Sequence, residues 1–195
     1  RELIDARAEW DESLWREIAD MGFLGVTLPE EFGGLGMTEL DLGVISEELG
    51  RANTALPFFS SIILAADAIN LAGSDAQKAH WLPKLASGEA IGTFAYAEGA
   101  AGWTGDAVKT RVDGATLSGQ KTPVADGGVA TVAVVLARVA DKPALALVDL
   151  AQSGVTRSRL NSFDQLRAHY AIQFDAAAAE LLESAPTERV LDQLF

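Results

Sequence analysis

The chain has 195 residues and 49% of them are hydrophobic, which is enough to bury a core in one or two domains. Its formal net charge of -13 excludes a basic nucleic-acid-binding face and disfavours docking to anionic lipid. The sequence contains no cysteine, which excludes disulfides, thiolate catalysis and cysteine-bound metals, and we expect a cytoplasmic protein. No apolar run reaches the length of a membrane span, so no membrane contact is expected.

The first half of the chain is predicted to be helical. Apolar residues recur at intervals of three and four along residues 1–21, which indicates an amphipathic helix that ends at Gly22. Thr38 is a good N-cap for a second helix ending at Gly50. A third helix is expected over residues 57–72.

A fourth helix opens with a capping-box pattern, because Ser74 is followed three residues later by Gln77. It is expected to run to Leu85 with an irregular last turn, since it contains Pro83. After Ala90 the pattern changes to short β-rich runs separated by turn residues, which favours a barrel or sandwich over βαβ units. Strands are expected near residues 91–97, 107–112, 115–118, 129–139, 144–149, 155–160 and 171–174, and a last helix near residue 186.

Residue patterns alone offer few catalytic candidates. The two histidines, His80 and His169, lie far apart in the sequence, which argues against a metal pair, and no phosphate loop or nucleophile elbow is present. The glycine cluster at 33–36 is interpreted as a compact loop that needs positive φ angles. The small-residue segment at 99–105 has two interpretations: it admits a large planar ligand close to the backbone, or it is a mobile hairpin loop.

Several segments together resemble the acyl-CoA dehydrogenase family, and their order and spacing match its helical domain. In the helical region they are MGFLGV (21–26), PEEFGGLG (29–36), EELGRA (47–52), GSDAQK (73–78) and LPKLASGE (82–89). The resemblance continues through LSGQK (117–121) and ends near residues 174–175, so it spans nearly the whole chain.

The resemblance implies an α+β fold in three parts. Residues 1–89 would form an N-terminal all-α helical domain and residues 90–184 an antiparallel β-barrel domain. Residues 185–195 would start a C-terminal helical domain. In such proteins FAD lies between the β-domain and the helical domains, and a neighbouring subunit helps to hold it. A carboxylate of the C-terminal domain removes the α-proton of an acyl-CoA thioester, hydride passes to the flavin, and an electron-transferring flavoprotein reoxidises it. No residue of this chain matches that base, so no catalytic residue is assigned.

The sequence departs from the family where the flavin is expected. The family pattern Thr-Glu-Pro-x-Ala-Gly-Ser-Asp reads AEGAAGWT at 97–104, which replaces a flavin-contacting threonine and a serine of the phosphate region. The pattern Trp-Ile-Thr/Ser, which places an indole and a hydroxyl beside the flavin, reads PVA at 123–125. Each replacement removes a hydrogen-bond donor or a stacking surface. By correspondence, the cofactor-facing positions are Tyr96, Ala97, Gly102, Trp103, Val124 and Ala125, and no metal site is predicted.

Three functions follow as hypotheses. The first is a subunit for FAD-dependent α,β-desaturation of an acyl-CoA, with a sterol side chain or another bulky acyl group, in steroid or lipid catabolism. This subunit would be the non-catalytic member of an α2β2 heterotetramer, with FAD held at the subunit interface or by the partner alone. The segment DQLR at 164–167 resembles the Asp-x-Thr-Arg form of such relatives. The alternatives are a competent homo-oligomeric acyl-CoA dehydrogenase with atypical FAD contacts, and a structural or assembly protein without chemistry.

Overall fold

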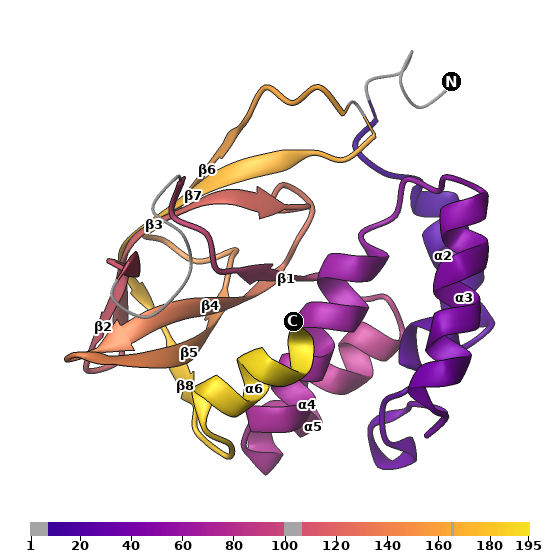
Figure 1. Ribbon diagram of the computed structural model, residues 1–195, viewed down its shortest axis with the longest axis horizontal. Helices are drawn as coiled ribbons and strands as arrows, with labels where there is room; N and C mark the ends of the chain where they lie inside the picture. Colours follow the sequence, from indigo (N-terminus) through magenta and orange to yellow (C-terminus); the bar gives the residue numbers. More distant parts are fainter. Residues whose placement is uncertain (1–7, 100–106, 165) are drawn as a thin grey trace.

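The computed structural model describes residues 8–99, 107–164 and 166–195, with helices on one side and a sheet on the other (Figure 1). The helical elements are α2 (Glu12–Asp20), η1 (Phe23–Gly25), η2 (Glu30–Phe32), α3 (Glu39–Arg51), η3 (Phe59–Ala66), α4 (Asp67–Ala72), α5 (Asp75–Ala86) and α6 (Thr187–Leu194). The strands are β1 (Gly92–Ala95), β2 (Arg111–Asp113), β3 (Thr116–Ala125), β4 (Val132–Val139), β5 (Lys142–Asp149), β6 (Val155–Arg159), β7 (His169–Ala178) and β8 (Glu180–Leu182).

The helix ends follow local capping chemistry. Helix α2 begins at Glu12, because the Asp11 side chain accepts the amide of Leu14 at 3.0 Å and fixes the N-terminus there. The part of the first predicted helix at residues 1–7 lies outside the described residues. The capping box before α5 is confirmed, since Ser74 and Gln77 exchange side-chain hydrogen bonds. The expected irregular last turn of this helix was wrong, because α5 continues as α-helix through Pro83 to Ala86.

The third predicted helix is present, but its first half is a π-helix. The π-helical segment η3 lies against β1, and the backbone amide of Gly92 donates to the Ser61 hydroxyl at 2.9 Å. A Cβ atom at Gly92 would lie 2.6 Å from the Cβ of Ala65, so only glycine permits this close approach of helix and strand. Two serines, Ser60 and Ser61, are buried on this side of η3 and face the sheet.

The eight strands form one mostly antiparallel sheet in the order β6-β7-β3-β2-β4-β5-β8, with β1 paired to β4. The pairs β1–β4 and β2–β4 are parallel. All seven expected strands are present, β3 is longer than expected, and the short strand β8 was missed. The α+β fold class is confirmed. The sheet is not a complete barrel, because in the part of the chain that the structure describes the end strands β6 and β8 pair with β7 and β5 and not with each other.

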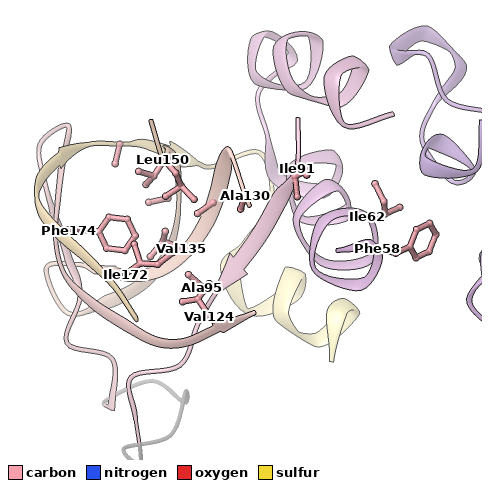
Figure 2. Close-up of a cluster of buried hydrophobic side chains, with 14 of the residues drawn as sticks. Phe58, Ile62, Ile91, Ala95, Val124, Ala130, Val135, Leu150, Ile172 and Phe174 are labelled. Carbon is pink, nitrogen blue, oxygen red and sulfur yellow. The ribbon is translucent and has the colours of Figure 1, made fainter. Parts of the chain in front are cut away.

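The hydrophobic core runs without a break from the sheet into the helices. Figure 2 shows Phe174, Val135 and Val124 inside the curled sheet, and Ile62 and Phe58 continuing the same cluster at the helices. On the other side, α6 contacts α4 and β5 and shares a second cluster with them. Each cluster contains residues from both sides of a predicted domain boundary, at 89/90 or at 184/185. These boundaries therefore remain predictions from the sequence.

Two features are absent from the described residues. No helix among them combines the length and apolar character needed to cross a bilayer. Likewise, no group of three or more His, Asp or Glu side chains among them is arranged to hold a metal ion.

Candidate functional site

The candidate site is the place where the chain leaving β1 meets the end of β3. Glu98 forms a parallel bridge with Thr122, and the Thr122 amide donates to the Ala97 carbonyl at 2.8 Å. The Thr93 hydroxyl donates to the Ala125 carbonyl at 2.7 Å. These contacts bring together two segments that the sequence analysis singled out separately. We call Tyr96, Ala97 and residues 123–125 the predicted flavin edge.

A buried ion pair lies directly behind this edge. The Lys121 ammonium donates to Glu98 Oε1 at 2.7 Å and to the Tyr96 carbonyl at 3.2 Å. The side chain of Lys121 is 0% exposed and that of Glu98 is 8% exposed. Glu98 also accepts the backbone amides of Lys109 at 2.7 Å and Thr110 at 3.0 Å. The pair therefore ties β3, the end of β1 and the chain before β2 into one frame.

The pKa values of this pair follow from burial and hydrogen bonding. Burial by itself raises the pKa of Glu98, but hydrogen bonds from Lys121, Thr110 and Lys109 outweigh it and lower the pKa to about 2. Burial lowers the pKa of Lys121, and Glu98 opposes that shift. Glu98 is thus held as a carboxylate and is unsuited to accept a proton near neutral pH.

Apart from Tyr96, the side chains at the edge itself are apolar. Ala97 and Ala125 are half-buried and present methyl groups, whereas Pro123 is exposed. Val124 is fully buried in the hydrophobic core (Figure 2), so only its main chain is available to a ligand at the edge. The pairing of β3 with β7 shifts register between Lys121 and Val124, and as a result the side chains of Lys121 and Val124 are both buried.

Three predicted positions remain, and the structure describes one of them, Tyr96. The Tyr96 ring lies 5.3 Å from Phe195 of the C-terminal segment and 6.1 Å from Phe94, measured between ring centroids. Tyr96 is therefore part of an aromatic cluster with the chain after α6. Gly102 and Trp103 lie outside the described residues.

These residues can be compared with what a flavin ring needs. Isoalloxazine carries several hydrogen-bonding atoms, and a protein holds it with donors and a stacking surface. Ala97, Pro123, Val124 and Ala125 offer no side-chain donor and no aromatic face. Two of the main-chain carbonyls nearby, at Tyr96 and Ala125, already accept hydrogen bonds from the protein. Apart from Tyr96, the described part of the edge offers no side chain that would hold a flavin tightly.

A second buried charge lies on the other side of the edge. Asp126 is 5% exposed, and the Ser60 hydroxyl of η3 donates to its Oδ2 at 2.6 Å. The Arg167 guanidinium lies 3.9 Å away, beyond hydrogen-bond distance. Burial raises the pKa of Asp126, and Ser60, Arg167 and His169 lower it only in part.

The glycine cluster at 33–36 has a structural role. In the glycine cluster, Gly33 and Gly36 have φ angles of +82° and +60°. The amides of Leu35, Gly36 and Met37 donate to backbone carbonyls at 2.8–2.9 Å, so they are not available to an anion. This confirms the interpretation of a compact loop.

The comparisons with known proteins agree with this fold. Residues 1–89 match the family model of the acyl-CoA dehydrogenase N-terminal domain. The (2S)-methylsuccinyl-CoA dehydrogenase of Cereibacter sphaeroides is 39% identical over 126 residues, which are 62% of this chain and 23% of that protein.

The solved structures extend the likeness over the whole chain. A variant of the Tcur3481-Tcur3483 steroid acyl-CoA dehydrogenase is 32% identical, with a TM-score of 0.86 over 99% of this chain and 54% of that one. The ChsE4-ChsE5 complex of Mycobacterium tuberculosis is 27% identical, with a TM-score of 0.86 over 99% of this chain and 53% of that one.

The chain therefore has the helical and β parts of an acyl-CoA dehydrogenase fold, and the similar solved structures include an acyl-CoA dehydrogenase in complex with FAD. The chain belongs to the acyl-CoA dehydrogenase family, as the sequence resemblance indicated. It spans about a quarter of the length of the curated relative and about half of the solved chains.

Sequence reasoning missed the role of the Lys121–Glu98 pair. A signal was present, because Leu117, Gly119 and Lys121 share one face of β3 and Leu117 is fully buried. A lysine in register with buried residues needs an anionic partner. Identifying Glu98 as that partner required the tertiary structure.

Proposed function

We propose that this chain is a non-catalytic subunit of a heteromeric acyl-CoA dehydrogenase. It would keep the family frame and pair with a second subunit in an α2β2 assembly, where FAD is held at the interface or by the partner alone. The observation that carries the proposal is the contrast at the flavin edge: the Lys121–Glu98 frame is intact, while Ala97 and residues 123–125 present no polar or aromatic side chain in front of it.

The substrate class is proposed from the relatives. A steroid acyl-CoA dehydrogenase is 32% identical to the chain over nearly its whole length. This favours an acyl-CoA with a sterol side chain or another bulky acyl group, in steroid or lipid catabolism. An electron-transferring flavoprotein as the electron acceptor and a cytoplasmic location belong to the same proposal.

Protein partners need a contact surface, and the helical part offers one. Leu35, Met37 and Val44 are 43–59% exposed and line a shallow apolar hollow of about 240 Å³ together with Phe23 and Ile45. Grouped apolar side chains at the surface are typical of sites of protein contact. This hollow is a candidate for one of the protein contacts named above.

Flavin content is the direct test. The chain would be purified alone and together with co-expressed candidate partner subunits, and the flavin absorbance and the mass of the intact complex would be measured. We expect a colourless chain alone and a yellow heteromer with one FAD per heterodimer. A yellow, active protein from the chain alone would instead support a competent homo-oligomeric enzyme. A colourless chain that forms no active complex would support an assembly protein.

The edge can also be tested within the chain. Ala97→Thr combined with Trp103→Ser, and separately Ala125→Thr, restore the family's residue types at these positions. If these positions face a flavin, FAD retention should increase, by about three- to tenfold for each hydrogen bond gained. Ala144→Thr, on β5 and away from the edge, is the control and should change nothing. Unchanged retention in both edge variants would count against the correspondence with the family pattern.

A further inference from the structure

A second pocket lies at the junction of the helices and the sheet, on the Asp126 side of the predicted flavin edge. Its volume is about 270 Å³, and it is lined by α3, the chain between α3 and η3, η3 itself, and the connection between β6 and β7. None of the residues of the flavin edge lines it. Its site is therefore separate from the one on which the proposed function rests.

The wall of this pocket is apolar. Leu56 and Phe58 are buried beneath it, and Leu49 and Ile63 are half-buried along its sides. These side chains come from three different elements and converge on one space, as in the apolar part of a small-molecule site. A cavity of 150 Å³ lined by such residues holds a benzene ring, so this pocket has room for a ring or a short alkyl chain.

Two side chains at the rim of the pocket can donate hydrogen bonds to a ligand. In the described part of the chain, the side chains of Asn53 and Arg167 make no hydrogen bond. The charge partner of Arg167 is Asp126, at 3.9 Å. By contrast, the hydroxyls of Ser46 and Thr54 donate to helix carbonyls and are not free to donate to a ligand.

Negative charge at the rim is limited. Asp164 also lines the pocket, but its Oδ1 accepts the amide of Leu166 at 2.9 Å and is held toward its own loop. The carboxylate of Asp126, the charge partner of Arg167, is buried against Ser60. The guanidinium of Arg167 is thus the cationic group best placed to meet a ligand entering the pocket.

We propose that this pocket binds a small apolar carboxylate. The alkyl chain or ring would fill the space between Leu49, Leu56 and Ile63, and the carboxylate would accept hydrogen bonds from Arg167 and Asn53. An anion is favoured over a neutral or cationic head because a charge-assisted hydrogen bond to guanidinium is stronger than a neutral one. The pocket is proposed to act independently of flavin, so its test does not depend on the partner subunit.

The first measurement compares the binding of three six-carbon probes to the purified protein. Hexanoate, hexanol and hexylamine would each be titrated by calorimetry and by ligand-observed NMR. We expect saturable hexanoate binding at millimolar or lower concentration, with hexanol about tenfold and hexylamine more than tenfold weaker. Equal affinity for the three probes, or no saturation by hexanoate at roughly 10 mM, would overturn the proposal.

Two variants with matched controls locate the site. Arg167→Gln should weaken hexanoate about tenfold and leave hexanol unchanged, whereas Arg111→Gln, an exposed arginine outside the pocket, should have no effect. Gly50→Trp should block all probes, because Gly50 lines the pocket and a Cβ there meets open space. Gly43→Trp lies on the same helix, also meets open space and does not line the pocket, so it controls for folding.

Thermal melting would accompany each variant to establish that it is folded. Unchanged hexanoate binding in a folded Gly50→Trp protein, or an equal loss in Gly43→Trp, would place the binding elsewhere and refute the assignment. The flavin measurements of the proposed function involve neither variant, so failure of one proposal can be distinguished from failure of the other.

Discussion

Two buried carboxyl groups, those of Glu98 and Asp126, lie on either side of the flavin edge, and they differ in how they are paired. On one side, Lys121 and Glu98 are in contact at 2.7 Å, and two backbone amides complete the carboxylate's hydrogen bonds. On the other side, Asp126 has a hydroxyl at 2.6 Å and a guanidinium only at 3.9 Å. The pKa of Glu98 falls to about 2, while the pKa of Asp126 is raised. Burial opposes ionisation of both carboxyl groups, and only at Glu98 do the hydrogen bonds outweigh it.

The largest expected effect comes from breaking the fully paired side. Lys121→Met should lower the free energy of unfolding by about 3–5 kcal/mol, because it leaves the carboxylate of Glu98 buried without its counterion. Urea denaturation at pH 7 measures this effect. Adding Glu98→Gln should recover part of the loss, since a neutral amide needs no counterion and its oxygen still accepts a backbone amide.

As the pH falls, the two carboxyl groups change the stability of the fold in opposite directions. The pKa of Glu98 is lower in the folded protein than in the unfolded chain, so its stabilising contribution is complete above about pH 4.5 and is lost as the pH falls toward 2. This contribution is on the order of 3 kcal/mol. Asp126 has a raised pKa in the folded protein, so it contributes in the opposite direction, and protonating it on acidification stabilises the fold.

Denaturation curves between pH 7 and pH 3 of the native chain, Glu98→Gln and Asp126→Asn check these signs. Glu98→Gln should flatten the loss of stability below pH 4.5. Asp126→Asn should remove the opposing gain and so make the decline toward acid steeper. The same slope in all three proteins would mean that neither group differs between the folded and unfolded states.

A smaller effect is expected on the weakly paired side. Ser60→Ala removes the one hydroxyl that donates to Asp126 and should cost about 1–3 kcal/mol at pH 7. Below the pKa of Asp126 the cost should shrink, because a protonated carboxyl needs less stabilisation. Ser87→Ala, an exposed serine that donates to a helix carbonyl, is the control. A cost for Ser60→Ala that does not vary with pH would show that the hydroxyl serves packing alone.

The smallest effect is expected at an exposed ion pair. Arg51 pairs with Glu47 at 2.8 Å, but both side chains are at least 65% exposed. Arg51→Gln should change the free energy of unfolding by less than about 0.5 kcal/mol, because solvent screens the pair. Measured beside Lys121→Met, it shows how much of the frame's stability comes from burial of the pair. A loss above 2 kcal/mol at Arg51 would contradict that explanation.

Much of the secondary structure was predictable because its signals are local. Capping at Ser74, the change of period after Ala90 and the restart of a helix near residue 186 all act within a few residues of the chain, and the structure contains each of these features. The predicted helix is interrupted at residues 8–11, although the helical period runs through them, because the cap at Asp11 sets the start of α2. The short strand β8 was missed because three residues give too little pattern.

The amino-acid sequence by itself determined the class of fold, the family motifs and the loss of polar residues at positions 97 and 123–125. Only the tertiary structure decided which side chains meet. Lys121 and Glu98 are 23 residues apart, and Ser60 and Asp126 are 66 apart, so their contacts depend on strand pairing and on how η3 lies on β1. Such contacts form when distant apolar surfaces are buried together, and no short-range pattern encodes that register.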